Sequence, residues 1–405
     1  MIDLFRRSSG ADGPQKTETS KSERVPVLSS PSPATDTDEG SESAQRSRLL
    51  FGLILGSMVA LWGRRHRQQQ DSGAQLAPSE RSGGRSLRGS QSSNALNVVR
   101  LGLVADVQYA DKDNKLVAGA FRHYRNALHK LARVVEAFES ESATLDAVLQ
   151  LGDLVDGQEQ LEASRADLEL VMEQFARLPL PLYHVLGNHC LLCGREWLLK
   201  RLRTRPYYDV PLGSRATTTT TTETSADSPE ACWHLVVLDC LDVSLHWDDP
   251  SDPRRVQAER FLKEQAGTTP NAVPYNGGIG ESQLVWLEGV LTECRTRREF
   301  ALVVGHVPIA PGSAAPSLLL WNYEEVMTLF RAYRDVVKLV LAGHEHDGGY
   351  AQVDGIHYLT LPGLVNAAEG DDNAYAILEL VGHSFARLHG FGRVPSRLLL
   401  FQPSC

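Results

Sequence analysis

Nearly continuous apolar runs alternate with longer amphipathic segments from residue 97 to the end of the chain. The apolar runs are short and are followed by Gly, Pro or Asp, which is typical of buried strands. The intervening segments place apolar residues at helical spacing, which predicts amphipathic helices. The predicted strands are 97–106, 145–153, 181–189, 232–240, 300–308, 336–346, 356–364 and 374–381, and the predicted helices are 123–141, 164–178, 281–295 and 321–335. This alternation predicts an α/β domain.

Residues 1–97 have a different composition. They are rich in Ser, Thr, Pro and mixed charge, with little to bury, so we expect a disordered tail. The exception is the uncharged segment 49–62, which has arginines on both sides. As a helix it would span about 21 Å, less than the ~30 Å of a bilayer core. A membrane anchor and a partner-binding helix both remain open, and we expect a cytoplasmic or organellar location.

The predicted strands end in side chains that can bind metal ions. These are Asp106, Gln108, Asp153, Asn188, His306, His344 and His346. Two pairs, Asp106 with Gln108 and His344 with His346, are two residues apart and would share one face of a strand. Carboxylate, carboxamide and imidazole ligands together favour Mn²⁺, Fe²⁺ or Zn²⁺ over Ca²⁺ and Mg²⁺. The pattern indicates a metal site at the strand ends. Such a site can activate water for attack on a phosphoryl group.

Charge and cysteine content exclude other classes. The net charge is 41 − 50 = −9 with no basic block in the globular part, so we expect no nucleic-acid partner. Cys190 and Cys193 form a CxxC motif without a second one, which does not complete a zinc knuckle. We expect the remaining cysteines to be buried thiols in a reducing compartment. The Thr-rich stretch at about 213–230 is predicted to be a surface loop insertion.

The motifs D-x-Q, GDLVDG, GNH, GHVP and GHEH, in this order, resemble the signature of the metallophosphoesterases (calcineurin-like phosphoesterases). The stretches VADVQYAD, YNGGI, WNY, AGHEHDGGY and GRVPSR resemble the Mn²⁺-dependent ADP-ribose/CDP-alcohol diphosphatases in particular. The resemblance covers residues 98–397. It implies a catalytic domain over 98–403, built as a four-layer α/β/β/α sandwich of two mixed sheets flanked by helices. We expect this domain to be monomeric.

The resemblance also implies a dinuclear metal centre, with Mn²⁺ expected and Fe²⁺ or Zn²⁺ as alternatives. By position, one ion would be held by Asp106, Gln108 and His346, the other by Asn188, His306 and His344, and Asp153 would bridge them. Gln108 stands where most metallophosphoesterases have histidine. A carboxamide oxygen is a harder and weaker ligand, which favours Mn²⁺.

His189 resembles the histidine that protonates the leaving group, and such a histidine needs an orienting partner. Cys190 occupies the position of an acid in the family pattern GNHE. Asp156, in GDLVDG, resembles the acid that pairs with this histidine in related phosphatases. We therefore expect His189 and Asp156 to be catalytic, with Asp156 replacing the missing acid.

Substrate contacts are predicted from the resemblance of neighbouring loops and from arginine chemistry. The predicted residues are Arg122, Arg125, Tyr275, Asn276, Gly277, Trp321, Asn322 and Tyr323. A solvated helix face is the alternative for the two arginines, and a core position is the alternative for Trp321. Trp197, Trp233 and Trp286 lie in apolar patterns and are predicted to pack in the core.

The implied function is hydrolysis of the diphosphate bond of ADP-ribose and of CDP-alcohols such as CDP-choline and CDP-glycerol. The products would be AMP or CMP and a phosphorylated sugar or alcohol, formed by attack of water activated by two metals. One alternative is a metallophosphoesterase for a cyclic nucleotide, phosphoprotein or phospholipid. Another is an inactive, membrane-tethered binding protein that retains the fold.

Overall fold

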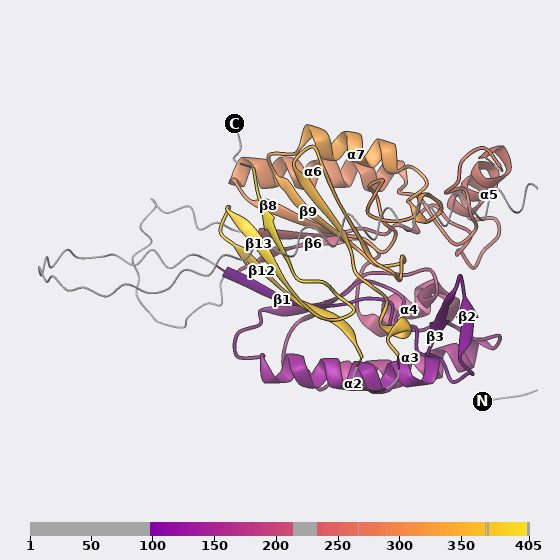
Figure 1. Ribbon diagram of the computed structural model, residues 1–405. Coiled ribbons are helices and arrows are strands. Elements are labelled where there is room, and N and C mark those ends of the chain that lie inside the picture. Colours follow the sequence, from indigo (N-terminus) through magenta and orange to yellow (C-terminus); the bar gives the residue numbers. More distant parts are fainter. Residues whose placement is uncertain (1–97, 214–232, 266, 369, 371, 403–405) are drawn as a thin grey trace, which may run out of the picture. The chain divides into compact units, whose positions relative to one another are not determined.

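The computed structural model describes residues 98–213, 233–265, 267–368, 370 and 372–402, all within a compact unit spanning 91–405. Two six-stranded sheets lie face to face, with helices on the outer face of each (Figure 1). The helices on one side are α2 (Tyr124–Ser140) and α3 (Leu161–Phe175), and those on the other are α6 (Glu281–Arg297) and α7 (Tyr323–Ala332). The predicted four-layer sandwich is therefore confirmed.

The first sheet combines the two ends of the described chain. Its strand order is β14 (Arg397–Leu400), β13 (Phe385–Gly392), β12 (Ala374–Val381), β1 (Val98–Val104), β4 (Ala147–Gln150) and β5 (Leu182–His184). Strands β1, β4 and β5 are parallel, whereas β12 pairs antiparallel with β1. The parallel strands therefore deliver their following loops to one edge of the sheet.

The second sheet repeats this arrangement. Its order is β10 (Gly349–Val353), β11 (Ile356–Thr360), β9 (Val337–Ala342), β8 (Phe300–Val304), β7 (Trp233–Val237) and β6 (Tyr208–Leu212). Strands β7, β8, β9 and β11 are parallel, and the two outer strands are antiparallel to their neighbours. Polar side chains beyond β8 and β9 are thereby brought to one end of the sheet, where open α/β folds hold their sites.

Close packing joins helix α2 to the first sheet. A Cβ atom on Gly102 would lie 3.0 Å from the ring of Phe138, so the strand needs glycine where this ring crosses it. Phe138 also packs edge-on against Tyr375 of β12. In the second sheet Trp233 is fully buried and its indole N–H donates to the carbonyl of Gly382. The tryptophan predicted to pack there does so, and Trp197 and Trp286 also contact the core.

The predicted strands and helices are all present, but several further elements were not predicted. These are β2 (Lys115–Val117), β3 (Ala120–Arg122), α4 (Arg195–Leu202), α5 (Pro253–Gln265), β6, β10, β13 and β14. Many of their side chains are partly or fully exposed, and α5 buries only Ala258 among its residues. Sequence periodicity is therefore weak in these segments, because it reports a buried face.

Two predictions fall largely or wholly outside the described residues. The tail 1–97, including the apolar segment 49–62, is one, and the Thr-rich insertion is the other, since residues 214–232 are not described. Among the helices of the described ranges, none combines the length and apolar character needed to cross a membrane.

Candidate metal centre

The predicted metal ligands lie in loops that follow the strands. Strands β1 and β9 end before Asp106 and His344, so the prediction that the paired ligands share a strand face is wrong. Asp106, Gln108, Asp153 and His344 instead have φ angles of 49°, 40°, 52° and 69°. This left-handed conformation is costly for residues other than glycine and gathers at functional sites. The strained turns aim these side chains inward.

Asp153 lies at the centre of the cluster. Its carboxylate accepts hydrogen bonds from the backbone N–H of His189 at 2.9 Å and from Nε2 of Gln108 at 3.0 Å. One ligand atom each of Asp153, His306 and His344 lie within 4.8 Å of one another. The loop after β4 is thereby brought against loops of the second sheet.

His306 is fully buried and held in one orientation. Its Nδ1 donates to the carbonyl of Leu151 at 2.8 Å. The opposite nitrogen, Nε2, lies 3.2 Å from Oδ1 of Asn188 and 3.3 Å from Oδ2 of Asp153. Nε2 therefore faces two oxygen atoms, and a cation bound there could be shared by all three side chains.

The other two histidines have side-chain amides as partners. Nδ1 of His346 lies 2.5 Å from Oδ1 of Asn366, and its Nε2 lies 3.3 Å from Oδ1 of Asp106. Nε2 of His344 lies 2.9 Å from Oδ1 of Asn276. An amide oxygen accepts the imidazole N–H in each case, which leaves the other ring nitrogen able to bind a cation.

Glycines permit the close approach of these loops. A Cβ on Gly187 would lie 2.1 Å from Oδ1 of Asp153, and one on Gly152 would lie 2.3 Å from Nδ1 of His306. Gly152 also has a φ of 99°, which favours glycine. A larger side chain would therefore clash at Gly152, between β4 and Asp153, and at Gly187, between β5 and Asn188.

Burial and mutual charge set the protonation of the cluster. Burial alone would raise the pKa of Asp153, but the imidazoles of His306 and His189 hold it well below its ordinary value. Burial opposes the charge of His306, yet the Asp153 carboxylate raises its pKa to about 9. Burial and the neighbouring His306 hold the pKa of His344 well below its ordinary value. A bound cation would take the place of the proton between Asp153 and His306.

His189 contacts Asp156 in two ways. Its Nδ1 donates to the backbone carbonyl of Asp156 at 2.8 Å and lies 3.4 Å from the carboxylate. Lys112 and Arg122 form ion pairs with the same carboxylate. The Asp156 carboxylate is thus held by two cationic side chains. The Nε2 atom of His189 is not used in these contacts and can bind a substrate.

Cys190 points into the core. Its Sγ accepts the backbone N–H of Leu154 at 3.0 Å, and burial raises the pKa of the thiol. Cys190 is not among the residues that line the cavity at the site. Cys190, which occupies the position of an acid in the family pattern, therefore stabilises the loop after β4.

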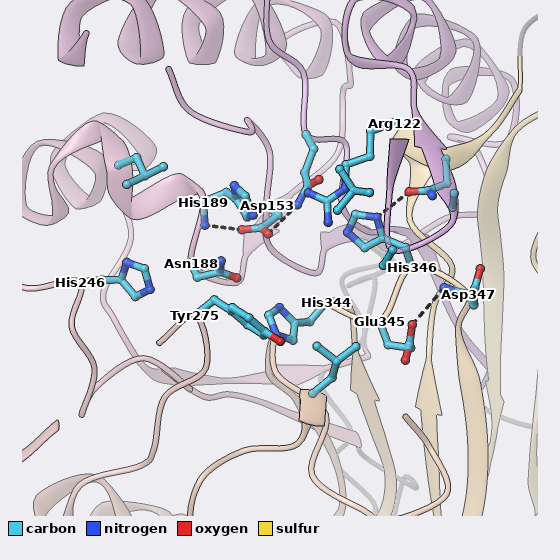
Figure 2. Close-up of a pocket in the computed structure, with 17 residues that line it drawn as sticks. Arg122, Asp153, Asn188, His189, His246, Tyr275, His344, Glu345, His346 and Asp347 are labelled. Carbon is cyan, nitrogen blue, oxygen red and sulfur yellow. Dashed lines mark hydrogen bonds between the residues drawn. The ribbon is translucent and has the colours of Figure 1, made fainter. Parts of the chain in front are cut away.

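A cavity of about 480 Å³ opens over the cluster (Figure 2). It is lined by Gln108, Asp153, Asn188, His189, His344 and His346, together with Arg122 and Tyr275 among the predicted substrate contacts. Asp106 and His306 are fully buried and do not contribute to the lining. The cavity is large enough for a small-molecule ligand.

The sequence did not single out His246, which also lines the cavity. Its Nε2 is buried without a hydrogen-bond partner, and burial together with the charge of Arg195 lowers its pKa to about 4. The neutral ring offers a polar atom next to the predicted ligands. His246 lies in the stretch SLHWDD. No apolar run that ends in glycine precedes this stretch, so the pattern that identified the predicted ligands did not identify His246.

Several predicted substrate contacts lie away from this cavity. Arg125 pairs with Asp111 and Asp113 on the surface. Asn276 is fully buried, and its Nδ2 donates to three backbone carbonyls. Trp321 stacks on Phe261 in a small buried cluster. Gly277, Asn322 and Tyr323 are likewise absent from the cavity lining. Substrate binding by these residues stays a prediction.

Gln150 supports the loop that carries Asp153. Its Oε1 accepts the N–H of Gly152 at 2.9 Å, and its Nε2 contacts the carbonyl of Val185 and Nδ1 of His184. His184 must be neutral to accept from this amide. Burial, followed by the charge of Arg201, lowers the pKa of His184 to about 4.

This low pKa predicts a loss of stability in mild acid. Below pH 6.5 the unfolded chain binds a proton at His184, whereas the native state does not until about pH 4. The free energy of unfolding should fall across this window by about 3 kcal/mol from this group. Urea unfolding at several pH values should show a smaller fall in His184→Gln. Above pH 7 the difference between the two proteins should be constant, and equal slopes below pH 6.5 would contradict the assignment.

The chain is similar to proteins of known activity. The calcineurin-like phosphoesterase family model matches residues 99–348. A manganese-dependent ADP-ribose/CDP-alcohol diphosphatase of Arabidopsis thaliana is 35% identical over 66% of this chain and 87% of the relative. The Homo sapiens protein of that name is 31% identical over 77% and 95%. A dimetal phosphatase from Danio rerio superposes with a TM-score of 0.66 and 27% identity, covering 76% of this chain and 100% of the other.

Proposed function

Because the chain belongs to the calcineurin-like phosphoesterase family, we propose that it is a manganese-dependent ADP-ribose/CDP-alcohol diphosphatase. It hydrolyses the diphosphate bond of ADP-ribose to give AMP, and that of CDP-alcohols to give CMP. The observation that carries the proposal is the convergence of carboxylate, carboxamide and imidazole groups around Asp153 at the base of one cavity. The relatives that cover most of this chain have this activity in their names.

The side chains fit a pair of divalent cations. Oε1 of Gln108 is buried without a hydrogen-bond partner, while Nε2 of the same amide donates to Asp153. An unpaired buried oxygen costs about 1–3 kcal/mol, and a cation would satisfy it. The mixture of oxygen and nitrogen donors suits Mn²⁺.

The proposed coordination follows the sequence-based assignment. Asp106, Gln108 and His346 would hold one ion, Asn188, His306 and His344 would hold the other, and Asp153 would contribute to both. When bound, the two ions supply an activated water and neutralise charge that develops on the phosphoryl oxygens.

The protein residues around the ions position the substrate and move the proton. Nδ1 of His189 is bonded to the carbonyl of Asp156, so Nε2 is the atom that donates a proton to the departing phosphate. The nearby carboxylate of Asp156 stabilises the protonated ring. Arg122 lines the cavity and offers its guanidinium to the diphosphate.

The rest of the substrate meets the cavity wall. Tyr275 is 42% exposed, and its ring centroid lies 5.9 Å from that of His344. Its aromatic face can stack on a base or ribose while the diphosphate occupies the centre. The neutral His246 adds a polar contact in the same cavity.

The proposal is tested with the full chain, stripped of metal by chelation and reloaded with Mn²⁺, Mg²⁺ or Zn²⁺. AMP release from ADP-ribose and CMP release from CDP-choline should require Mn²⁺ and be absent in His344→Ala. A folded protein that releases neither nucleotide with any of these ions would overturn the proposal. Release from a cyclic nucleotide alone would support a different phosphoesterase.

A further inference from the structure

A second cluster of metal-binding groups lies at the other end of the second sheet. One ligand atom each of His234, Cys294 and Glu299 lie within 4.8 Å of one another. Glu299 directly precedes strand β8, whereas His306 follows it. Five strand residues span about 17 Å, so this cluster is separate from the centre at Asp153.

Regular structure places these three side chains. Arg298 ends helix α6 in the left-handed conformation, with φ 59°. The N–H of Glu299 then donates to the carbonyl of Cys294 at 2.9 Å, which holds both residues at the last turn. His234 of β7 pairs with Ala301 of β8. The cluster therefore forms when the helix docks on the sheet.

The contacts of His234 leave its second nitrogen without a proton donor. Nε2 lies 2.7 Å from Oδ2 of Asp209, which requires the ring proton to be on Nε2. Nδ1 then lies 3.2 Å from Oε2 of Glu299, and neither atom has a hydrogen-bond partner. The His234 side chain is only 4% exposed. Two buried acceptors facing each other repel unless a cation or a second ring proton lies between them.

The thiol of Cys294 favours a metal ion over a second ring proton. A doubly protonated His234 would satisfy Asp209 and Glu299, but it would not account for the Cys294 sulfur in the same cluster. Cys294 is 1% exposed and lies in the last turn of α6. Thiolate, imidazole and carboxylate together form a Zn²⁺ donor set.

We propose that His234 Nδ1, Cys294 Sγ and Glu299 Oε2 bind one Zn²⁺ ion that fastens helix α6 to strands β7 and β8. Asp209 orients the imidazole through Nε2, as carboxylates do for zinc-bound histidines. Binding displaces the thiol proton of Cys294 to solvent. Three protein ligands leave one coordination position for water.

One of the proposed ligands borders a surface cavity. Glu299 lines a surface cavity of about 420 Å³ together with Arg295, Arg298, Asp335 and His383. Arg297, whose Nη1 lies 3.9 Å from Oε2 of Glu299, offsets part of the negative charge that three anionic groups would bring. Of the three proposed ligands, Glu299 is the one that lines this cavity.

Cobalt spectroscopy tests the site directly, because a thiolate ligand gives Co²⁺ a charge-transfer band that oxygen and nitrogen ligands do not. The full chain is stripped of metal and titrated with Co²⁺. The band should appear, be lost in Cys294→Ser, and persist in Cys240→Ser, which changes another buried cysteine. It should also persist in Cys190→Ser, which changes the cysteine beside the dinuclear centre.

Two further measurements complete the test. Asp209→Asn should weaken Zn²⁺ binding about 10–100-fold, and Glu299→Gln serves as a second ligand variant if Cys294→Ser does not fold. Absence of a thiolate band, or a band that survives both ligand variants, would overturn the proposal and leave a protonated His234 as the explanation. Cys294→Ser should still release AMP with saturating Mn²⁺, so this result is independent of the proposed enzymatic function.

Discussion

Replacing Asp153 with Asn should lower the rate of AMP release by about 10³-fold or more, equivalent to roughly 4 kcal/mol of transition-state stabilisation. The amide keeps the size of the side chain, and asparagine tolerates the left-handed backbone that Asp153 adopts. It lacks the negative charge that both cations need. The variant should therefore fold normally and lose both Mn²⁺ and activity.

The measurement is the single-turnover rate at saturating ADP-ribose, together with the Mn²⁺ content after gel filtration. Asp146→Asn is the matched control, because Asp146 precedes strand β4 and accepts the N–H of Arg100 away from the cavity. A variant that kept two equivalents of Mn²⁺ and normal turnover would show that Asp153 is not the bridging ligand.

The second large effect is expected from His189→Gln, which should lower kcat about 10²-fold while Mn²⁺ content stays unchanged. Glutamine keeps a polar side chain next to Asp156 but cannot transfer a proton. The loss should depend on the leaving group, since a nitrophenolate departs without protonation. A nitrophenyl phosphodiester should therefore lose far less activity than ADP-ribose does.

His129→Gln provides the control, because His129 is exposed on helix α2. An equal loss for both substrates would assign His189 a role in placing the substrate or the ions. A fall in Mn²⁺ content would likewise indicate that His189 helps to position the ions. Only a selective loss with ADP-ribose supports proton donation.

The order of buried strands and helices followed from the sequence because burial on both faces leaves a continuous apolar run. The helix predicted over 123–141 differs from α2 by one residue at each end. Hairpin β2–β3 gave no such signal, since Leu116 and Phe121 are exposed. That hairpin nonetheless supplies Arg122 and part of the cavity wall.

The candidate ligands were found for a reason that the structure only partly supports. Asp106 and Gln108 were paired as neighbours on a strand face, yet both lie in a left-handed turn beyond β1. The sequence shows which residues follow a strand, whereas the turn that aims them is set by contacts with distant loops. His246 and the carbonyl contact of Asp156 with His189 depend on such contacts entirely.

The two sheets impose an order on metal loading during synthesis. Neither ligand set of the proposed dinuclear centre is complete before His344 and His346 exist, and His346 follows Asp106 by 240 residues. At about 5–20 residues per second, this delay is roughly 10–50 s. Strand β12, which pairs with β1, is made later still. The nascent chain therefore carries separated half-sites, which come together only after strands of both sheets have been made.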